Sequence, residues 1–178
     1  MRALVKNSRG FTLVEIIVSI VAFGVLMALI TGIFAPQVVR GTDPLFSMRA
    51  AELGQSYLEE MLGKRYAESS PQGNSLRCNA SGQPACGSLG PDAGETTHTT
   101  FDDFDDYNGF TDGSPTTAPT NQNGTARQNY VGFMVTASVV YAGTEIGLPN
   151  STDAKRVDVT ITDPRGAQTV FSAYKTNF

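Results

Sequence analysis

The chain has 178 residues and a formal net charge of −4, which is long enough for one globular domain of ordinary size. Three of its 13 basic residues, Arg2, Lys6 and Arg9, precede residue 10, so the rest of the chain opposes 10 basic to 17 acidic residues. A body with this negative charge lacks the electrostatic footprint of a nucleic-acid-binding protein, and we predict no direct nucleic-acid binding.

An apolar run occupies residues 11–35, and Glu15 is its only ionisable residue. As an α-helix the run would span roughly 37 Å, enough to cross a hydrocarbon core of about 30 Å. A buried globular helix of this length would carry a polar stripe, which this run lacks. A secretory signal would need small residues at both the first and third positions before its cut, and the run does not provide both. We therefore predict a retained transmembrane helix over 11–35. The basic flank predicts a cytoplasmic N-terminus and a periplasmic body.

Glu15 raises a question, because a lone acid within a bilayer costs about 2.5–3.5 kcal/mol on insertion scales. A cut between Gly10 and Phe11 would create an α-ammonium on Phe11, which shares a helix face with Glu15 four residues later. The ammonium of a neighbouring molecule could pair with Glu15 equally well, which would give the carboxylate a role in assembly. The alternative is a glutamate close enough to the interface to extend its carboxylate into water.

The stretch RGFTLVEIIVSI resembles the signature of type IV prepilins, in which a short basic leader ends in Gly and a Phe then opens a hydrophobic helix with Glu at its fifth position. The resemblance implies that residues 1–10 are a leader and that prepilin peptidase, an aspartic protease of the inner membrane, cuts between Gly10 and Phe11. It also implies N-methylation of Phe11, and a Glu15 that neutralises a neighbour's N-terminus during filament assembly.

A small-residue strip lies further along the same helix. Gly24, Ala28 and Gly32 recur every four residues, a spacing that lets helix backbones approach closely. We predict helix packing along this strip in a bundle of such helices. The alternative is the general abundance of Gly and Ala in membrane helices.

A kink and an amphipathic helix are predicted over 36–66. Pro36 and the GTDP sequence at 41–44 should interrupt or kink the helix, because proline removes a backbone donor and clashes with the preceding turn. Helical periodicity then resumes over 45–65. Its apolar stripe consists of Phe46, Ala50, Leu53, Tyr57 and Met61. We predict that this stripe packs on a sheet; the alternative is a helix that binds a partner.

Residues 67–129 are rich in Gly, Pro, Ser, Thr, Asn and Asp, and we predict long surface loops here in preference to a disordered linker. Cys78 and Cys86, the only cysteines, are predicted to form a disulfide in an exported domain. A metal site at these cysteines would need further ligands, and the lone His98 supplies no cluster.

The stretch FDDFDDYNGF at 101–110 places an aromatic residue at every third position, with aspartates between them. This repeat suits one or two turns of 3₁₀ or α-helix, with the aromatic rings docked and the acids exposed. The carboxylates of residues 102–106 could hold calcium, but their spacing does not fit the EF-hand loop. We favour a docked acidic loop and predict no metal-binding residue, and calcium stays an open alternative.

The C-terminal region, 130–178, is predicted to form an antiparallel sheet. Apolar residues alternate along one face of each expected strand. They are Val131, Phe133, Val135, Ala137, Val139 and Tyr141 in the first strand and Val157, Val159 and Ile161 in the second. A turn at 163–166 leads to a third strand. We predict an α+β fold of type IV pilin-like plan: a long hydrophobic stem helix and a head in which the amphipathic helix covers this sheet.

Three further stretches narrow the resemblance to minor pilins of the mannose-sensitive haemagglutinin (MSHA) pilus, MshD type. They are RAAELGQSYLEEMLGKRY, FDDFDDYNGF and TITDPRGAQTVFSAYKTNF. The resemblance implies a minor subunit that primes or joins a pilus used in adhesion or motility. Its implied partners are prepilin peptidase, the major pilin and other minor pilins, the inner-membrane assembly platform, and membrane lipid before assembly.

Two alternatives to this function stay open. One is a minor pseudopilin of a type II secretion system, and the other is a membrane-anchored periplasmic binding protein. An enzyme is not predicted, because the sequence has no GxxxxGK loop, no GxSxG elbow and no metal-ligand cluster, and we expect no catalytic residue and no cofactor.

Overall fold

The computed structural model describes residues 10–40, 43–70 and 77–177. The chain divides into two compact units, Met1–Pro44 and Leu45–Phe178, and each is described by itself. The predicted leader, apart from Gly10, lies outside the described residues.

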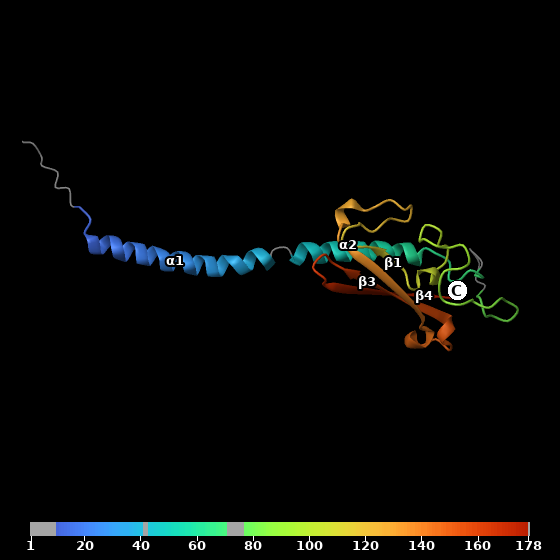
Figure 1. The fold of residues 1–178 in the computed structure, drawn as a ribbon. Helices are drawn as coiled ribbons and strands as arrows, with labels where there is room; N and C mark the ends of the chain where they lie inside the picture. The colour runs from blue at the N-terminus through green and yellow to red at the C-terminus, as the bar shows by residue number, and fades with distance from the viewer. Residues whose placement is uncertain (1–9, 41–42, 71–76, 178) are drawn as a thin grey trace, which may run out of the picture. The chain divides into compact units, whose positions relative to one another are not determined.

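Residues 10–40 of the first unit contain one helix, α1 (Leu13–Arg40) (Figure 1). The prediction placed the transmembrane segment over 11–35 and expected Pro36 to interrupt or kink the helix; α1 continues through Pro36 to Arg40. A proline within a helix removes one backbone donor, here the one that would reach the carbonyl of residue 32, and the other hydrogen bonds can still form. From residue 13 to residue 33 every side chain of α1 is exposed.

The second unit opens with most of α2 (Asp43–Leu62). The predicted stripe is confirmed, because four of its residues are buried and Phe46 packs partly buried against them. The four are Ala50, Leu53, Tyr57 and Met61. Their spacing of three and four residues places them on one face of the helix, and that face contributes to the main hydrophobic core of the unit.

The sheet has four antiparallel strands in the order β1-β2-β3-β4. The strands are β1 (Thr111–Gly113), β2 (Met134–Tyr141), β3 (Ala154–Thr162) and β4 (Gln168–Thr176). Valines at 135, 139, 157 and 159 are fully or almost fully buried on the face that joins the α2 core. The observed architecture is therefore the predicted α+β fold, with a helix packed on an antiparallel sheet.

Two details of the sheet differ from the prediction. Val131 does not belong to the first long strand and is 48% exposed, because Gly132 adopts a φ of +89° and turns the chain before β2 begins. The short strand β1 lies within the region predicted to be loops, and it pairs Thr111 with Thr136. Its sequence, TDG, shows no apolar alternation, which explains why the pattern did not reveal it.

Gly54 sets the distance between α2 and the sheet. A Cβ atom added at Gly54 would lie 2.4 Å from the ring of Phe171 on β4, closer than real side chains approach. Glycine is costly within a helix, so its presence here is explained by the close helix-to-strand contact.

Candidate functional site

The N-terminal junction is the first part of the molecule with a possible function. Gly10 and Phe11 are both exposed, and α1 begins two residues after Phe11. Thr12 stands directly before the helix, and its Oγ1 accepts the backbone N–H of Glu15 at 3.3 Å. This is an N-cap, and the sequence signal that could have revealed it is the T-x-x-E pattern at 12–15.

Glu15 therefore lies in the first turn of α1. A carboxylate there interacts favourably with the unpaired N–H groups of the helix start, which lowers the cost of placing it at the edge of an apolar segment. Among the described residues, Glu15 forms no ion pair with a basic side chain. Phe11 is joined to Gly10 in this chain, so its amine cannot yet pair with Glu15, and that pairing stays a prediction.

The segment Leu13–Ile33 is long and apolar enough to cross a membrane, with a mean hydropathy of 2.8. Its two hydroxyl side chains are satisfied within the helix: Ser19 donates to the carbonyl of Glu15 at 2.7 Å, and Thr31 donates to that of Met27 at 2.8 Å. Such bonds suit a helix in lipid, where no water replaces them. A Cβ added at Gly24 or Gly32 would meet no atom within 4 Å, so the predicted packing strip has no partner among the described residues.

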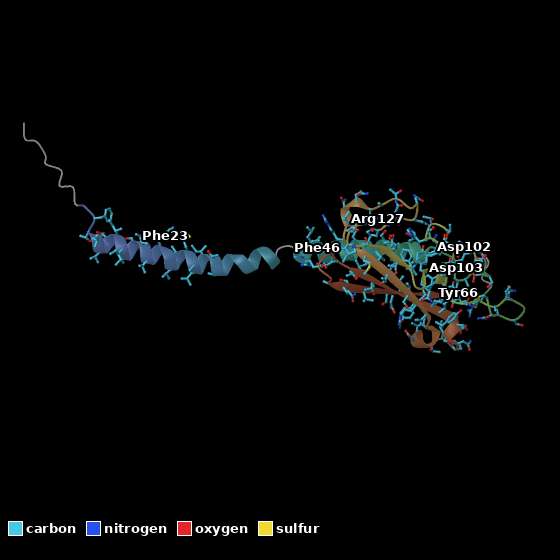
Figure 2. The ribbon with its side chains drawn as sticks, in the orientation of Figure 1. Phe23, Phe46, Tyr66, Asp102, Asp103 and Arg127 are labelled. Carbon is cyan, nitrogen blue, oxygen red and sulfur yellow. A yellow bond between two sulfur atoms is a disulfide. The ribbon has the colours of Figure 1, made fainter. Side chains whose placement is uncertain are left out.

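The second part with a possible function is the acidic stretch at 101–110 (Figure 2). It lies in the second unit, Leu45–Phe178, which is called the head from here on. The aromatic prediction is confirmed: Phe101, Phe104 and Tyr107 are buried, and Asp105–Tyr107 forms a 3₁₀ turn, η1. The prediction that the acids are exposed is wrong for most of them. Only Asp102 is exposed, whereas Asp103, Asp105 and Asp106 are at most 2% exposed.

One of these buried acids forms an ion pair with Lys155 of β3. Lys155 Nζ lies 2.8 Å from Asp105 Oδ1, and both side chains are buried. The same ammonium donates to the carbonyl of Tyr66 at 2.6 Å and lies 4.2 Å from the centre of the Tyr66 ring. Burial lowers the pKa of Lys155, and the pairing with Asp105 opposes this. The alternation of apolar residues in this strand predicted nothing about Lys155.

Asp103 and Asp106 bind the backbone of their own loop. Asp103 Oδ1 accepts the N–H groups of Asp105 and Asp106, and Asp106 Oδ2 accepts those of Asp102 and Asp103. Burial, followed by the neighbouring Asp105 carboxyl, raises the pKa of Asp103 to about 7. Burial also raises the pKa of Asp106.

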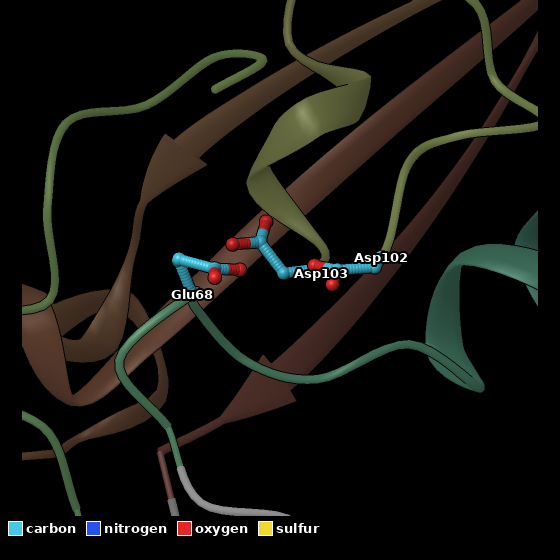
Figure 3. Close-up of side chains that lie close together, drawn as sticks. All are labelled: Glu68, Asp102 and Asp103. Carbon is cyan, nitrogen blue, oxygen red and sulfur yellow. The ribbon is translucent and has the colours of Figure 1, made fainter. Parts of the chain in front are cut away.

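Three more charged residues complete this acidic cluster. Arg65 contacts both Asp102 and Glu68, and the hydrogen bond from Arg65 holds the pKa of Asp102 below its ordinary value. Glu95 lies near Asp106, and burial together with that carboxyl raises the pKa of Glu95 to about 7. The carboxylates converge in two groups. One comprises Glu68, Asp102 and Asp103 (Figure 3), and the other Glu95, Asp102 and Asp106.

Asp112 on β1 ties α2 to the following loop. Its Oδ2 accepts from the Tyr57 hydroxyl at 2.7 Å and from both the backbone N–H and the hydroxyl of Thr120, and its Oδ1 accepts from the Gly113 N–H. Burial raises the pKa of Asp112, but these donors outweigh it, and the pKa lies below its ordinary value.

Asp112 also lines a hollow of about 650 Å³, together with Glu95, His98, Phe101, Asp106 and Phe110.

The structure contains the predicted disulfide between Cys78 and Cys86. Both residues are buried and form a second small core with Tyr66 and Ala67. Asn177, near the end of the chain, donates to the carbonyl of Cys78 at 2.9 Å. The bridge therefore fixes its loop against the C-terminal residues of the head.

Comparison with known proteins finds one similarity. Residues 5–31 match the model of the prokaryotic N-terminal methylation motif; the match covers residues 5–10 of the predicted leader, the Gly10–Phe11 junction and most of the apolar run 11–35. No curated protein and no solved structure matches the chain. The motif and the apolar helix α1 support the interpretation of the chain as a type IV pilin-like protein, a class of structural proteins. They are also consistent with anchoring in a membrane.

Proposed function

We propose that this pilin-like chain is a minor subunit of a type IV pilus of the MSHA kind, cleaved between Gly10 and Phe11 and then methylated on the amine of Phe11. In this proposal the chain is first held in the bacterial inner membrane by α1, with its head in the periplasm. It then enters or primes the filament at the cell surface, where its role is structural.

The observation that carries the proposal is the order of features at the N-terminus. A basic leader ends in Gly10 directly before a membrane-length helix, and Glu15 lies in the first turn of that helix. Glu15 forms no ion pair within the described residues, and cleavage at Gly10 would supply a cation for it, from its own Phe11 or from a neighbour's. The match to the methylation motif over 5–31 supports the same processing.

The exposed surface of α1 supports assembly with other pilins. Its apolar side chains from residue 13 to residue 33 are exposed in the described part of the chain, and lipid can cover them before assembly. In a filament, helices of the major pilin and of other minor pilins would replace lipid, and the strip of Gly24, Ala28 and Gly32 would let two helices approach closely. Prepilin peptidase and an inner-membrane assembly platform are the further partners that this route requires.

Mass spectrometry of the N-terminus of chain recovered from sheared filaments tests the proposal. We expect a peptide that begins at Phe11 and carries one added methyl group. Gly10→Val should leave full-length precursor in the membrane, because a branched side chain obstructs the peptidase, whereas Asn7→Ala in the same leader should be processed normally. An intact Met1 terminus on filament-derived protein would contradict the proposal.

Two other functions have specific support. A minor pseudopilin of a type II secretion system would use the same N-terminal features, and the neighbouring genes distinguish it: a secretion operon in place of a pilus operon. A membrane-anchored binding protein is favoured by the hollow beside Asp112 in the head. A leader retained on the mature protein would support that second function.

A further inference from the structure

The acidic cluster has a geometry that suits a metal ion. One carboxylate oxygen from each of Glu95, Asp102 and Asp106 lies within 4.8 Å of the other two. Calcium takes oxygen ligands at 2.3–2.6 Å, so two ligands of one calcium ion lie within about 5 Å of each other. The three oxygens therefore have the spacing of ligands around one such ion.

Asp106 provides a second, independent observation. Its side chain is almost fully buried, and its Oδ2 is occupied by two backbone N–H groups. Its Oδ1 is also buried, yet it has no hydrogen-bond donor within the described part of the chain. A buried charged oxygen is costly unless a donor or a cation reaches it, and nearly all such atoms in folded proteins have a partner.

The balance of charge points the same way. Arg65 pairs with Glu68 and Asp102, and Lys155 pairs with Asp105. Across residues 10–40, 43–70 and 77–177, no ion pair joins Glu95, Asp103 or Asp106 to a basic side chain. When its carboxyls are ionised, the cluster therefore carries more negative charge than its own basic residues balance.

A hollow lies directly beside the cluster. Glu95 and Asp106 both line this hollow of about 650 Å³. The donors are all carboxylate oxygens, which favours calcium over metals that prefer nitrogen or sulfur ligands.

We propose that the head binds one calcium ion between the carboxylates of Glu95, Asp102 and Asp106. The ion bridges the loop that holds Glu95 to the turn that holds Asp106. The remaining coordination positions are filled by water from the hollow, as is common for calcium sites with few protein ligands. The site is independent of the proposed function, since it lies wholly within the head.

The test uses the full chain, purified in detergent and stripped with EDTA. Isothermal titration calorimetry with CaCl₂ should show one site, with a Kd of about 10⁻⁴–10⁻³ M, the range of extracellular calcium modules. At a calcium concentration tenfold above the Kd, the Tm should rise by about 3–6 °C. Magnesium should bind at least about tenfold more weakly, because it demands a stricter geometry.

Two matched variants locate the site. Glu95→Gln should weaken calcium binding about tenfold or more, and it should fold, because Glu95 is only partly buried. Glu68→Gln makes the same change in the adjacent acidic group and should leave calcium binding unchanged. Asp102→Asn is a second test if Glu95→Gln does not fold, which circular dichroism would reveal. No heat and no Tm shift at about 10 mM calcium, or wild-type binding in Glu95→Gln, would overturn the proposal.

Discussion

Helix α1 and the head use apolar residues for opposite purposes. From residue 13 to residue 33 of α1 the apolar side chains are exposed, and the hydroxyls of Ser19 and Thr31 donate to carbonyls of their own helix. In the head the apolar side chains fill a core between α2 and the sheet, and the buried Lys155 and Asp105 pair within the same unit. The stability of α1 therefore depends on the lipid or protein that surrounds the chain, whereas the stability of the folded head depends on contacts within the head.

The buried ion pair offers the largest expected effect on the head. Lys155→Met should lower the free energy of unfolding by about 3–5 kcal/mol, because it leaves the Asp105 carboxylate buried without its cation. Urea unfolding of the chain in detergent measures this. Lys155→Met combined with Asp105→Leu should recover part of the loss, and Arg156→Met, at the exposed pair with Glu145, should change stability far less. Equal losses at Lys155 and Arg156 would show that burial of the pair is unimportant.

A pair of leucines compares the two regions directly. Leu53→Ala in α2 should cost about 2–5 kcal/mol of unfolding free energy, since Leu53 is fully buried and its truncation leaves a cavity. Leu26→Ala in α1 makes the identical change at a side chain that is 53% exposed, and the stability of the head should not change. The same urea titration measures both. A large loss from Leu26→Ala would refute the claim that the head is independent of α1.

The disulfide should have the next largest effect. In the chain-entropy model its short loop contributes roughly 2.5 kcal/mol. Replacing both Cys78 and Cys86 by Ser should lower the Tm while the head stays folded, because the main core lies elsewhere. Limited proteolysis should then cut within 78–86 in the variant only. Alkylation of two free thiols in native periplasmic protein would contradict the crosslink itself.

Asp112 should give the head a smaller, pH-dependent part of its stability. The pKa of Asp112 in the folded chain lies below its ordinary value of about 3.9, so its contribution is complete above that pH and is lost as the pH falls through the folded pKa. Asp112→Asn should therefore be less stable than wild type at pH 6, and the difference should shrink below about pH 4. Urea titrations of both proteins at several pH values measure it. A difference that stays constant down to pH 3 would exclude this role of the ionised carboxylate.

The sequence predicted the fold well wherever a periodic pattern controls burial. The stripe of α2 and the alternation of β2 and β3 are such patterns, and the structure places their apolar residues in one core. The short strand β1 was missed because it is held by its pairing with β2, which no local pattern encodes. The sequence left open whether Pro36 interrupts the helix or only kinks it, and α1 runs through Pro36 to Arg40.

The acidic cluster could not be predicted for a different reason. Aspartates between aromatic residues predict a solvent-exposed face, and among the aspartates of 102–106 only Asp102 is exposed. The burial of Asp103, Asp105 and Asp106 depends on Lys155 and on backbone donors of the loop, and Lys155 is fifty positions away from Asp105 in sequence. Tertiary electrostatics of this kind leave no local signature. The N-terminal site, by contrast, is contiguous in sequence and could be named residue by residue.

A change at Glu15 tests most directly the claim that partners outside the chain pair with Glu15 and cover α1. The measurement is the amount of Glu15→Gln subunit in sheared filaments, relative to wild type and to Thr12→Val. Thr12→Val removes the helix cap but keeps the carboxylate, so it separates capping from charge. We expect Glu15→Gln to be cleaved after Gly10 normally but to fall about tenfold in filaments, which corresponds to about 1.4 kcal/mol, while Thr12→Val stays near wild type. Normal incorporation of Glu15→Gln would contradict the pairing of Glu15 with a neighbour's N-terminus.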